Sequence, residues 1–258
     1  MKADFNGDSC VSMTSVEVNF RQPAKSAPVP LHLRAQAEAP GWKRTLDVAL
    51  VLLTLPFLAI LGIPIAIWIK VVSPGPAFFR QQRVGLGGRK FMCLKFRTMK
   101  VNADTGVHQQ HLAQLMKSNR PTRKLDNTGD KRLIPGGLVL RALGLDELPQ
   151  LLNVLRGDMS LVGPRPCTPF EFGMYEPRHQ KRCDALPGLT GLWQVSGKNR
   201  TTFEEMINLD LYYVEHQSPL LDLTILARTG PAILALVWEL AQRRAAASKD
   251  TAKEQSRP

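Results

Sequence analysis

A long uncharged stretch, residues 48–69, constrains the fold more than any other part of the chain. It is long enough to cross a bilayer as a helix, but Pro56 and Pro64 lie inside it and proline kinks helices. Lys43 and Arg44 precede the stretch and further Lys and Arg residues follow it, so both ends carry the charge preferred on the cytoplasmic side. We therefore predict a bent helix that enters the membrane and returns to the same face. A straight span is the first alternative, and a buried core helix fits less well because no polar face is present.

The composition indicates a negatively charged partner. The 258 residues suit one or two domains, and 34 Lys and Arg against 22 Asp and Glu give a formal net charge of +12. Such an excess favours nucleic acid, an anionic membrane surface or a nucleotide-linked substrate. Cys10, Cys93, Cys167 and Cys183 have the spacing of neither a disulfide framework nor a zinc site, which fits a reducing environment.

The two ends of the chain differ from its middle. Residues 1–40 are polar and contain no apolar core for a signal peptide, so we predict a mostly disordered leader. Residues 241–258 read as a polar basic tail. Between the middle and this tail, residues 220–240 are apolar but interrupted by Asp222, Arg228 and Pro231. This pattern favours an interfacial helix over a membrane span, with a core helix as the plainer alternative.

Asp146 and Glu147 introduce the clearest chemical signal, between residues 145 and 166. Asp146 is placed as the N-cap of a helix that carries Pro149 in its first turn. The apolar stripe expected on this helix comprises Leu148, Leu151, Leu152 and Leu155. The partial positive charge of a helix N-terminus keeps carboxylates ionised, and its unpaired N–H groups can receive an anion. An isolated Asp-Glu pair would more often be only a helix cap.

Arg165 supplies the second half of this signal. It stands between Pro164 and Pro166, whose fixed φ angles would hold the backbone and orient the guanidinium for bidentate contact with a phosphate. The carboxylate pair and this arginine together indicate one anionic substrate.

A β-hairpin is predicted from residues 78–84 and 90–97, which flank a glycine-rich turn. A phosphate-binding loop is a weaker alternative, because neither the dinucleotide-binding nor the P-loop spacing is present. Farther along, residues 107–117 look helical. His108 and His111 in that segment could share a face, as a metal site requires, but solvated helix histidines are the favoured interpretation.

The run from Leu145 to Pro166 resembles, nearly letter for letter, the signature of the bacterial sugar transferases, which are monotopic polyprenyl-phosphate phosphoglycosyl transferases. The resemblance covers roughly residues 42–237. It includes Lys43-Arg44-Thr45-Leu46-Asp47, Lys95-Phe96-Arg97-Thr98-Met99 and Leu209-Asp210-Leu211-Tyr212-Tyr213. It implies a re-entrant membrane helix and amphipathic helices at the membrane surface.

The resemblance further implies a reaction in two steps. Asp146 displaces UMP from a UDP-sugar to give an aspartyl phosphosugar, and the phosphate of polyprenyl (undecaprenyl) phosphate then attacks that intermediate. The attacking carboxylate and the diphosphate repel each other, and at about 4 Å each unit-charge pair costs roughly 4 kcal/mol at an effective dielectric near 20. The site therefore needs arginines and a hard cation such as Mg²⁺.

Individual roles follow from the matching positions. The resemblance implies Asp146 as nucleophile and Mg²⁺ ligand, Glu147 as its dyad partner, and Arg141 and Arg165 as phosphate binders. Two further residues, Arg97 as a phosphate binder and Asp158 as a supporting group, are equally well explained by structural salt bridges. Gln194, Gly197 and Asn199 lie in a loop that could bind a nucleotide, or that is simply a turn of the fold.

These expectations combine into an α+β fold, mostly helical with a small β-hairpin sheet. The catalytic domain would span residues 73–240 at the cytoplasmic face of the bacterial inner membrane, attached by a re-entrant helix over residues 41–72 and by amphipathic interfacial helices. Its partners would be a UDP-sugar, polyprenyl phosphate and anionic lipids, but not nucleic acid. Oligomeric state, the sugar and the glycan pathway stay open, with homo-oligomers included.

The sequence leaves two other functions open. A non-enzymatic basic protein that binds membrane surfaces or nucleic acid would leave Asp146, Glu147 and the Pro-Arg-Pro turn unexplained, and the chain has no recognised nucleic-acid motif. The second rival keeps the same transfer but lets the lipid phosphate attack directly, with Asp146 only holding Mg²⁺.

Overall fold

The structure is a computed structural model and describes residues 38–101, 113–114, 116, 118, 132–197 and 201–255. The longer helices are α2 (Gly41–Val72), α9 (Phe203–Glu215) and α10 (Pro219–Gln255). The short α-helices are α4 (Gly137–Ala142), α5 (Leu151–Arg156), α6 (Pro169–Gly173), α7 (Pro177–Gln180) and α8 (Leu192–Val195). The 3-10 helices are η1 (Leu86–Gly88), η2 (Leu145–Gln150) and η3 (Lys181–Asp184). The strands are β1 (Phe78–Val84), β2 (Lys90–Phe96), β3 (Ser160–Val162) and β4 (Gly188–Thr190), so the predicted α+β class is confirmed.

The predicted hairpin is confirmed as β1 and β2, which pair antiparallel with Phe79 opposite Lys95 and Arg83 opposite Phe91. Its turn contains Gly87 at a φ of 63°, a left-handed conformation that glycine adopts without strain. The parallel pair of β3 and β4 was not predicted. Each of these strands has only three residues, too few for an alternating pattern to stand out in the sequence.

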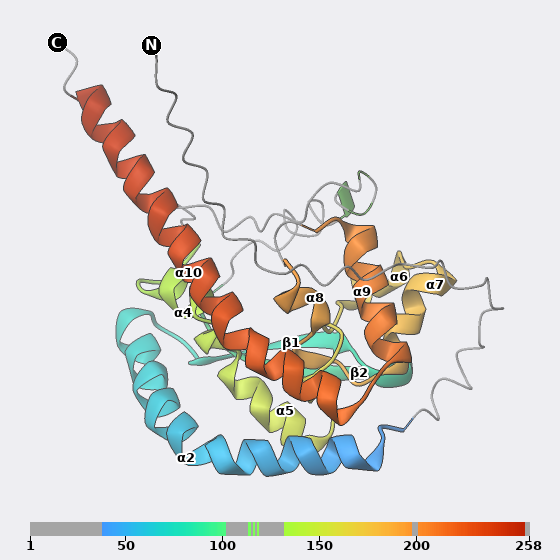
Figure 1. The fold of residues 1–258 in the computed structure, drawn as a ribbon. Helices are drawn as coiled ribbons and strands as arrows, with labels where there is room; N and C mark the ends of the chain where they lie inside the picture. Colours follow the sequence, from blue (N-terminus) through green and yellow to red (C-terminus); the bar gives the residue numbers. More distant parts are fainter. Residues whose placement is uncertain are drawn as a thin grey trace, which may run out of the picture.

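The apolar stretch lies inside α2, whose bounds are those predicted for the re-entrant helix, and Figure 1 shows that this helix runs in two arms that meet at a bend. Pro56 and Pro64 lie inside it, and each removes one backbone donor and crowds the preceding turn. Most of its surface is apolar and exposed; Leu53 and Phe57, for example, are each 70% exposed. By length and composition alone, α2 and residues Pro219–Trp238 of α10 could cross a membrane. A bend of this kind is what the re-entrant prediction requires.

The start of α2 is anchored in the protein by a buried polar cluster. The ammonium group of Lys43 lies 2.6 Å from Asp222 Oδ2 and donates to the Tyr213 hydroxyl at 2.8 Å, and all three side chains are buried. The Tyr213 hydroxyl donates to Asp222 Oδ1 at 2.8 Å. Asp47, one turn farther along α2, accepts hydrogen bonds from Ser160 Oγ and from the backbone of β3. The cluster therefore joins α2 to α9, α10 and β3.

This cluster corrects two predictions. Lys43 and Arg44 were counted as flanking charges that favour the cytoplasmic side, but Lys43 is fully buried and Arg44 donates to the carbonyls of Val154 and Leu155 at the end of α5. A cation at helix C-terminal carbonyls satisfies acceptors that lack intrahelical partners. Asp222 was treated as a polar interruption of the last apolar segment, whereas it is the buried partner of Lys43.

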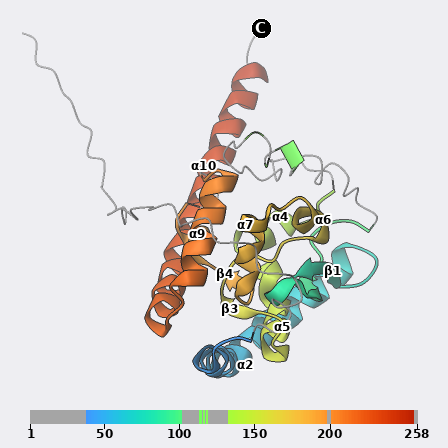
Figure 2. The ribbon, with the colours of Figure 1, turned by 90° about the vertical axis from the view of Figure 1, so that its right-hand side faces the viewer.

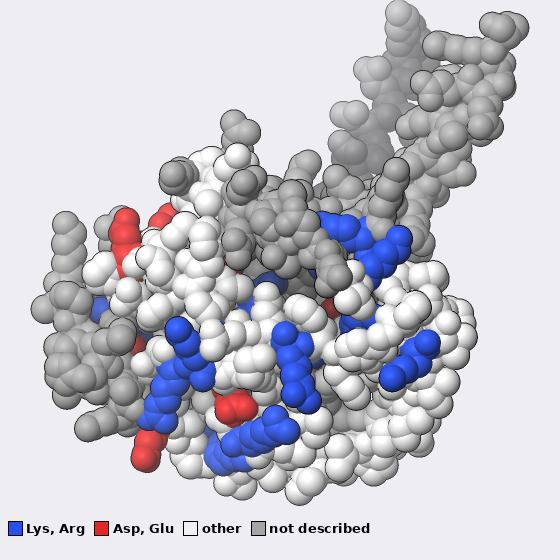
Figure 3. Space-filling view, turned by 180° about the vertical axis from the view of Figure 1, so that it is seen from behind, with Lys and Arg blue, Asp and Glu red and all other residues white. Residues whose placement is uncertain are grey.

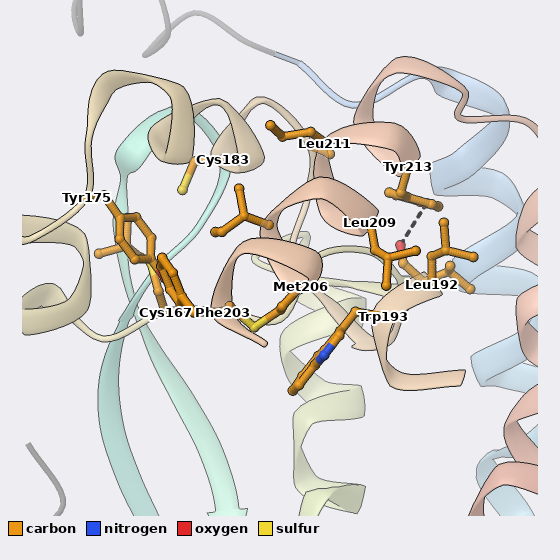
Figure 4. Packing of buried hydrophobic residues seen from close by; sticks show 14 of the residues in the cluster. Cys167, Tyr175, Cys183, Leu192, Trp193, Phe203, Met206, Leu209, Leu211 and Tyr213 are labelled. Carbon is orange, nitrogen blue, oxygen red and sulfur yellow. Dashed lines mark hydrogen bonds between the residues drawn. The ribbon is translucent and has the colours of Figure 1, made fainter. Parts of the chain in front are cut away.

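The main hydrophobic core lies between α9 and the segments that carry β3, α6, α7 and α8 (Figure 4). Phe203, Met206 and Ile207 point into it from the inner face of α9, and Trp193 enters from α8. The hydroxyl oxygen of Tyr213 also lies 3.1 Å from the Val162 carbonyl oxygen, which places the end of α9 against β3.

The end of the chain also differs from prediction. Helix α10 continues to Gln255, so the predicted boundary between catalytic domain and tail at residue 240 is not the end of a helix. Figures 1 and 2 show that the last turns of α10 extend away from the rest of the fold. Most of the leader predicted over residues 1–40, namely residues 1–37, lies outside the described residues, as do His108, His111 and Asn199.

Helix α9 begins with a capping box, and its loss is expected to destabilise the core. Thr202 Oγ1 accepts from the Glu205 N–H at 3.2 Å, while the Glu205 carboxylate accepts from the Thr202 N–H at 2.8 Å. Thr202→Ala should lower the free energy of unfolding by about 1 kcal/mol, measured by urea denaturation in detergent. The control Thr224→Ala, whose partly exposed hydroxyl donates only to Leu220 O within α10, should change it by less than about 0.5 kcal/mol. Equal decreases in the free energy of unfolding for the two variants would show that the capping box does not stabilise the protein more than an ordinary hydroxyl contact.

Candidate active site

Asp146 and Glu147 lie in the first turn of η2. The predicted N-cap role of Asp146 is wrong, because Gly144 occupies the N-cap position with a φ of 69° and the α-helix α5 begins only at Leu151. The predicted apolar stripe is confirmed at Leu151, which is buried, but Leu152 is 46% exposed. Asp146 is 9% exposed, and η2 packs directly against β2. The carboxylate pair therefore sits on a short, tightly wound turn held against the hairpin.

One face of the hairpin lines an open hollow beside this turn. Side chains alternate along a strand, so Arg83, Cys93 and Lys95 share a face. All three line a hollow that is partly open to solvent and encloses only about 20 Å³. Glu147 and Gln150 of η2 also line it, and the ammonium group of Lys95 lies 2.9 Å from Glu147 Oε1. Asp146 is not among the lining residues, although its neighbour Glu147 is.

Arg165 enters the same hollow from the loop after β3. The loop is tightly held: a Cβ on Gly163 would meet the Leu186 carbonyl at 2.1 Å, so no larger residue fits there. Arg182 donates to the Arg165 carbonyl at 3.0 Å, and Arg83 donates to the Pro166 carbonyl at 3.0 Å. The backbone of the Pro-Arg-Pro turn is thus fixed on both sides, and the structure brings Arg165 and Glu147 to one hollow as predicted.

The electrostatics of the hollow centre on Arg83. Burial lowers the pKa of Arg83, and the positive charge of Arg165 lowers it further, while Glu171 acts in the opposite direction. Burial alone would raise the pKa of Glu171, but Arg83 and the hydrogen bond from the Thr168 N–H hold it below its usual value. Burial raises the pKa of the Cys93 thiol, which stays neutral. The hollow therefore gathers the positive charges of Arg83, Lys95 and Arg165, with Glu147 as the one carboxylate among the described residues that line it.

Arg97 and Asp158, which were both predicted to belong to the site, make hydrogen bonds that hold elements of the fold together. Both terminal nitrogens of Arg97 donate to backbone carbonyls, to Pro74 O at 2.6 Å and to Ser73 O at 2.7 Å, and the side chain is 5% exposed. These contacts favour the structural alternative over phosphate binding. Asp158 accepts a hydrogen bond from the Asn153 amide at 3.2 Å, and that amide also donates to Met92 O of the hairpin. Asp158 thus supports the packing of α5 on β2.

The remaining predicted residues are only partly brought together. Gln194 of α8 lines the hollow, where its amide donates to Leu189 O and its buried Oε1 has no hydrogen-bond partner among the described residues. Gly197 is exposed and does not line the hollow. Arg141 lies on α4, which packs against η2, so it is close to the carboxylate turn in the fold.

The chemistry of a magnesium ion fits the carboxylate pair. Within the described part of the chain, no group of three or more His, Cys, Asp or Glu side chains is placed to hold a metal. Mg²⁺ typically uses one or two carboxylates and completes its shell with water and substrate phosphate oxygens, so a closed protein cage is not required. Asp146 and Glu147 supply carboxylates of that kind beside an open hollow.

Sequence reasoning missed Arg83 and Lys95 as members of the site. The signal was available, since both belong to the predicted hairpin and the alternation of its strands places them on one face with Cys93. Without the fold, however, nothing indicates that this face rather than the other lies against η2.

The surface charge agrees with an anionic partner. Figure 3 shows several Lys and Arg side chains spread over the face opposite that of Figure 1, with fewer Asp and Glu among them. Such a surface attracts negatively charged substrates and lipid headgroups.

Comparison with known proteins shows the family. Residues 38–236 match the family described as bacterial sugar transferase. The exopolysaccharide production protein ExoY of Sinorhizobium fredii is 41% identical over 198 residues, covering 74% of this chain and 84% of that protein. The UDP-glucose:undecaprenyl-phosphate glucose-1-phosphate transferase of Caulobacter vibrioides is 43% identical over 200 residues, covering 74% of this chain and 69% of that protein. The undecaprenyl-phosphate galactose phosphotransferase of Salmonella typhimurium is 39% identical over 202 residues, covering 74% of this chain and 40% of the longer relative. The chain therefore belongs to the bacterial sugar transferase family.

Proposed function

We propose that this protein transfers a sugar 1-phosphate from a UDP-sugar to undecaprenyl phosphate and releases UMP, as the first membrane step of exopolysaccharide synthesis. The observation that carries the proposal is the hollow that gathers Arg83, Lys95 and Arg165 beside the Asp146-Glu147 turn. Relatives named for glucose 1-phosphate and galactose phosphate transfer to undecaprenyl phosphate support the substrate classes. The apolar surface of α2 supports a place at the membrane, which we assign to the cytoplasmic face of the inner membrane because UDP-sugars are water-soluble cytoplasmic donors.

The first step forms a covalent intermediate. A carboxylate oxygen of Asp146 attacks the sugar-linked phosphorus of the UDP-sugar, and the bond from that phosphorus to the bridging oxygen breaks. UMP leaves with the bond electrons, and the sugar phosphate remains on Asp146 as an acyl phosphate. Arg165 and Arg83 neutralise the diphosphate as charge shifts to the leaving group, with little motion because the Pro-Arg-Pro backbone is fixed.

The second step transfers the phosphosugar to lipid. An oxygen of undecaprenyl phosphate attacks the same phosphorus, the acyl phosphate bond breaks, and Asp146 is regenerated as a carboxylate. Lys95 would neutralise the incoming phosphate, a role supported by its position in the lining of the hollow next to Glu147. The product is an undecaprenyl diphosphate-linked sugar.

A magnesium ion would be held by Asp146, with Glu147 beside it, and when bound would screen the repulsion between carboxylate and diphosphate. Glu147 also keeps Lys95 in place through their ion pair. Arg141 would stabilise phosphate from the α4 side of the carboxylate turn.

The test is an intact-protein mass measurement without lipid. Wild type and Asp146→Asn are each mixed with Mg²⁺ and a panel of UDP-sugars, including UDP-glucose and UDP-galactose. We expect a sugar-phosphate adduct on wild type alone, and its mass identifies the class of sugar. Turnover with lipid but no adduct from any donor would instead favour direct attack by the lipid phosphate, with Asp146 as a metal ligand only.

A further inference from the structure

The hollow has two different ends, and the hairpin fixes which end lies nearer the membrane helix. Strand β1 starts a few residues after α2, so the open end of the hairpin, with Phe79 opposite Lys95, lies beside the end of α2. Arg83 lies four residues farther along β1, about 13 Å away at strand spacing. Lys95 therefore marks the membrane side of the hollow, and Arg83 marks the far side.

The connection at the membrane side is rigid. Arg97 holds the turn after α2 by donating to Ser73 O and Pro74 O, and its backbone N–H donates to Ala77 O at 2.9 Å. Ala77 packs with Ile69 of α2 and Phe96 of β2 in one apolar cluster. The end of α2 and the open end of the hairpin therefore keep a fixed distance. Trp68, which is 50% exposed near this end, has the amphipathic side chain favoured at a membrane interface.

Phe79 is the apolar residue at this end that shares a face with the site. It lies directly across from Lys95, on the face of the hairpin that carries Arg83 and Cys93, and it is 44% exposed. Phe78 is 49% exposed but belongs to the opposite face, where its ring stacks on Phe96 at 5.4 Å. An exposed aromatic ring beside a cationic group offers one apolar and one charged contact to the same ligand.

We propose that Phe79 binds the isoprene units next to the phosphate of the lipid acceptor, so that the acceptor enters at the Lys95 end and the nucleotide occupies the Arg83 end. This inference rests on the proposed function. A prenyl phosphate joins an anionic head to an apolar chain that stays in the membrane, and its phosphate must reach the hollow while its chain points toward α2. Lys95 and Phe79 match those two parts in that order.

The test compares Phe79→Ser with Phe78→Ser in the full-length protein, held in detergent micelles with undecaprenyl phosphate. For Phe79→Ser we expect the KM for undecaprenyl phosphate to rise about 3- to 10-fold, the loss that follows from removing one partly buried aromatic contact. The KM for the UDP-sugar and the yield of adduct without lipid should stay within twofold of wild type. Phe79→Leu should restore most of the acceptor affinity, because it keeps an apolar side chain.

The matched control is expected to leave both KM values unchanged, since Phe78 has the same side chain and similar exposure on the other face. If Phe78→Ser fails to fold because Phe96 loses its partner, Met92→Ser takes its place; Met92 is 46% exposed on that same outer face. An unchanged acceptor KM in Phe79→Ser, or equal increases in Phe79→Ser and the control, would overturn the inference. Absence of transfer by wild type would instead refute the proposed function, and this inference with it.

Discussion

Asp146→Asn is expected to lower the rate of transfer from UDP-sugar to undecaprenyl phosphate by roughly 10³- to 10⁵-fold. The amide has nearly the shape of the carboxylate but carries no negative charge, so it neither attacks phosphorus nor binds a hard cation well. Because Asp146 is 9% exposed, the near-isosteric change limits any effect on packing. The measurement is UMP release together with lipid-linked product, at saturating concentrations of both substrates.

Glu147→Gln provides the comparison at the neighbouring position. It keeps the nucleophile but weakens the pair with Lys95, whose two side chains are 21% and 34% exposed. Such a partly exposed pair contributes no more than about 1 kcal/mol to stability, so the variant should fold normally. We expect the rate of transfer to fall roughly 10- to 100-fold, which is the range for a group that assists the reaction without forming the covalent bond. If Asp146→Asn retains more than a tenth of wild-type activity, Asp146 is not the nucleophile.

Lys43→Met is expected to have the largest effect on stability and to lower the free energy of unfolding by about 3 to 5 kcal/mol. The substitution leaves the Asp222 carboxylate, 1% exposed, with Tyr213 as its remaining partner in the cluster. A buried charge without its counter-ion costs far more than the pair contributes, and the lost contact also detaches the start of α2 from α10. Urea denaturation in detergent, followed by tryptophan fluorescence, measures the change.

Two further variants test whether the loss of stability comes from the buried ion pair. Lys70→Met removes an exposed lysine at the other end of α2 and should change the free energy of unfolding by less than about 0.5 kcal/mol. The double variant Lys43→Met/Asp222→Leu removes both charges and should recover at least half of the loss, because replacing a buried pair by apolar groups is often nearly neutral. If Lys43→Met lowers the free energy of unfolding no more than Lys70→Met does, the cluster does not anchor α2.

Several elements could be read from the sequence because their signals are local. The uncharged stretch lies within α2, and two strand-like runs around a glycine turn correspond to β1 and β2. The Pro-Arg-Pro turn indicated an arginine aimed at an anion, and Arg165 does line the hollow. Each of these patterns depends on residues close together in the chain, where periodicity and fixed φ angles act directly.

Other features depended on partners far away in the chain. The N-cap assigned to Asp146 was wrong because the tight turn that begins at Gly144 replaced a regular helix start. Arg97 had the residue type of a phosphate binder, but its donors are taken by the carbonyls of the turn after α2. Propensity and motif describe what a side chain can do, and its neighbours decide which of those options is used.

The sequence by itself determined the long apolar helix, the hairpin, the positive charge and the carboxylate pair with its nearby arginine. Only the tertiary structure decided that Lys43 is a buried partner of Asp222 across 179 positions, and that one face of the hairpin lies against η2 to place Lys95 beside Glu147. The physical reason is that a charge or a strand face is defined locally, whereas its burial and its counter-charge are set by segments that meet only when the chain folds.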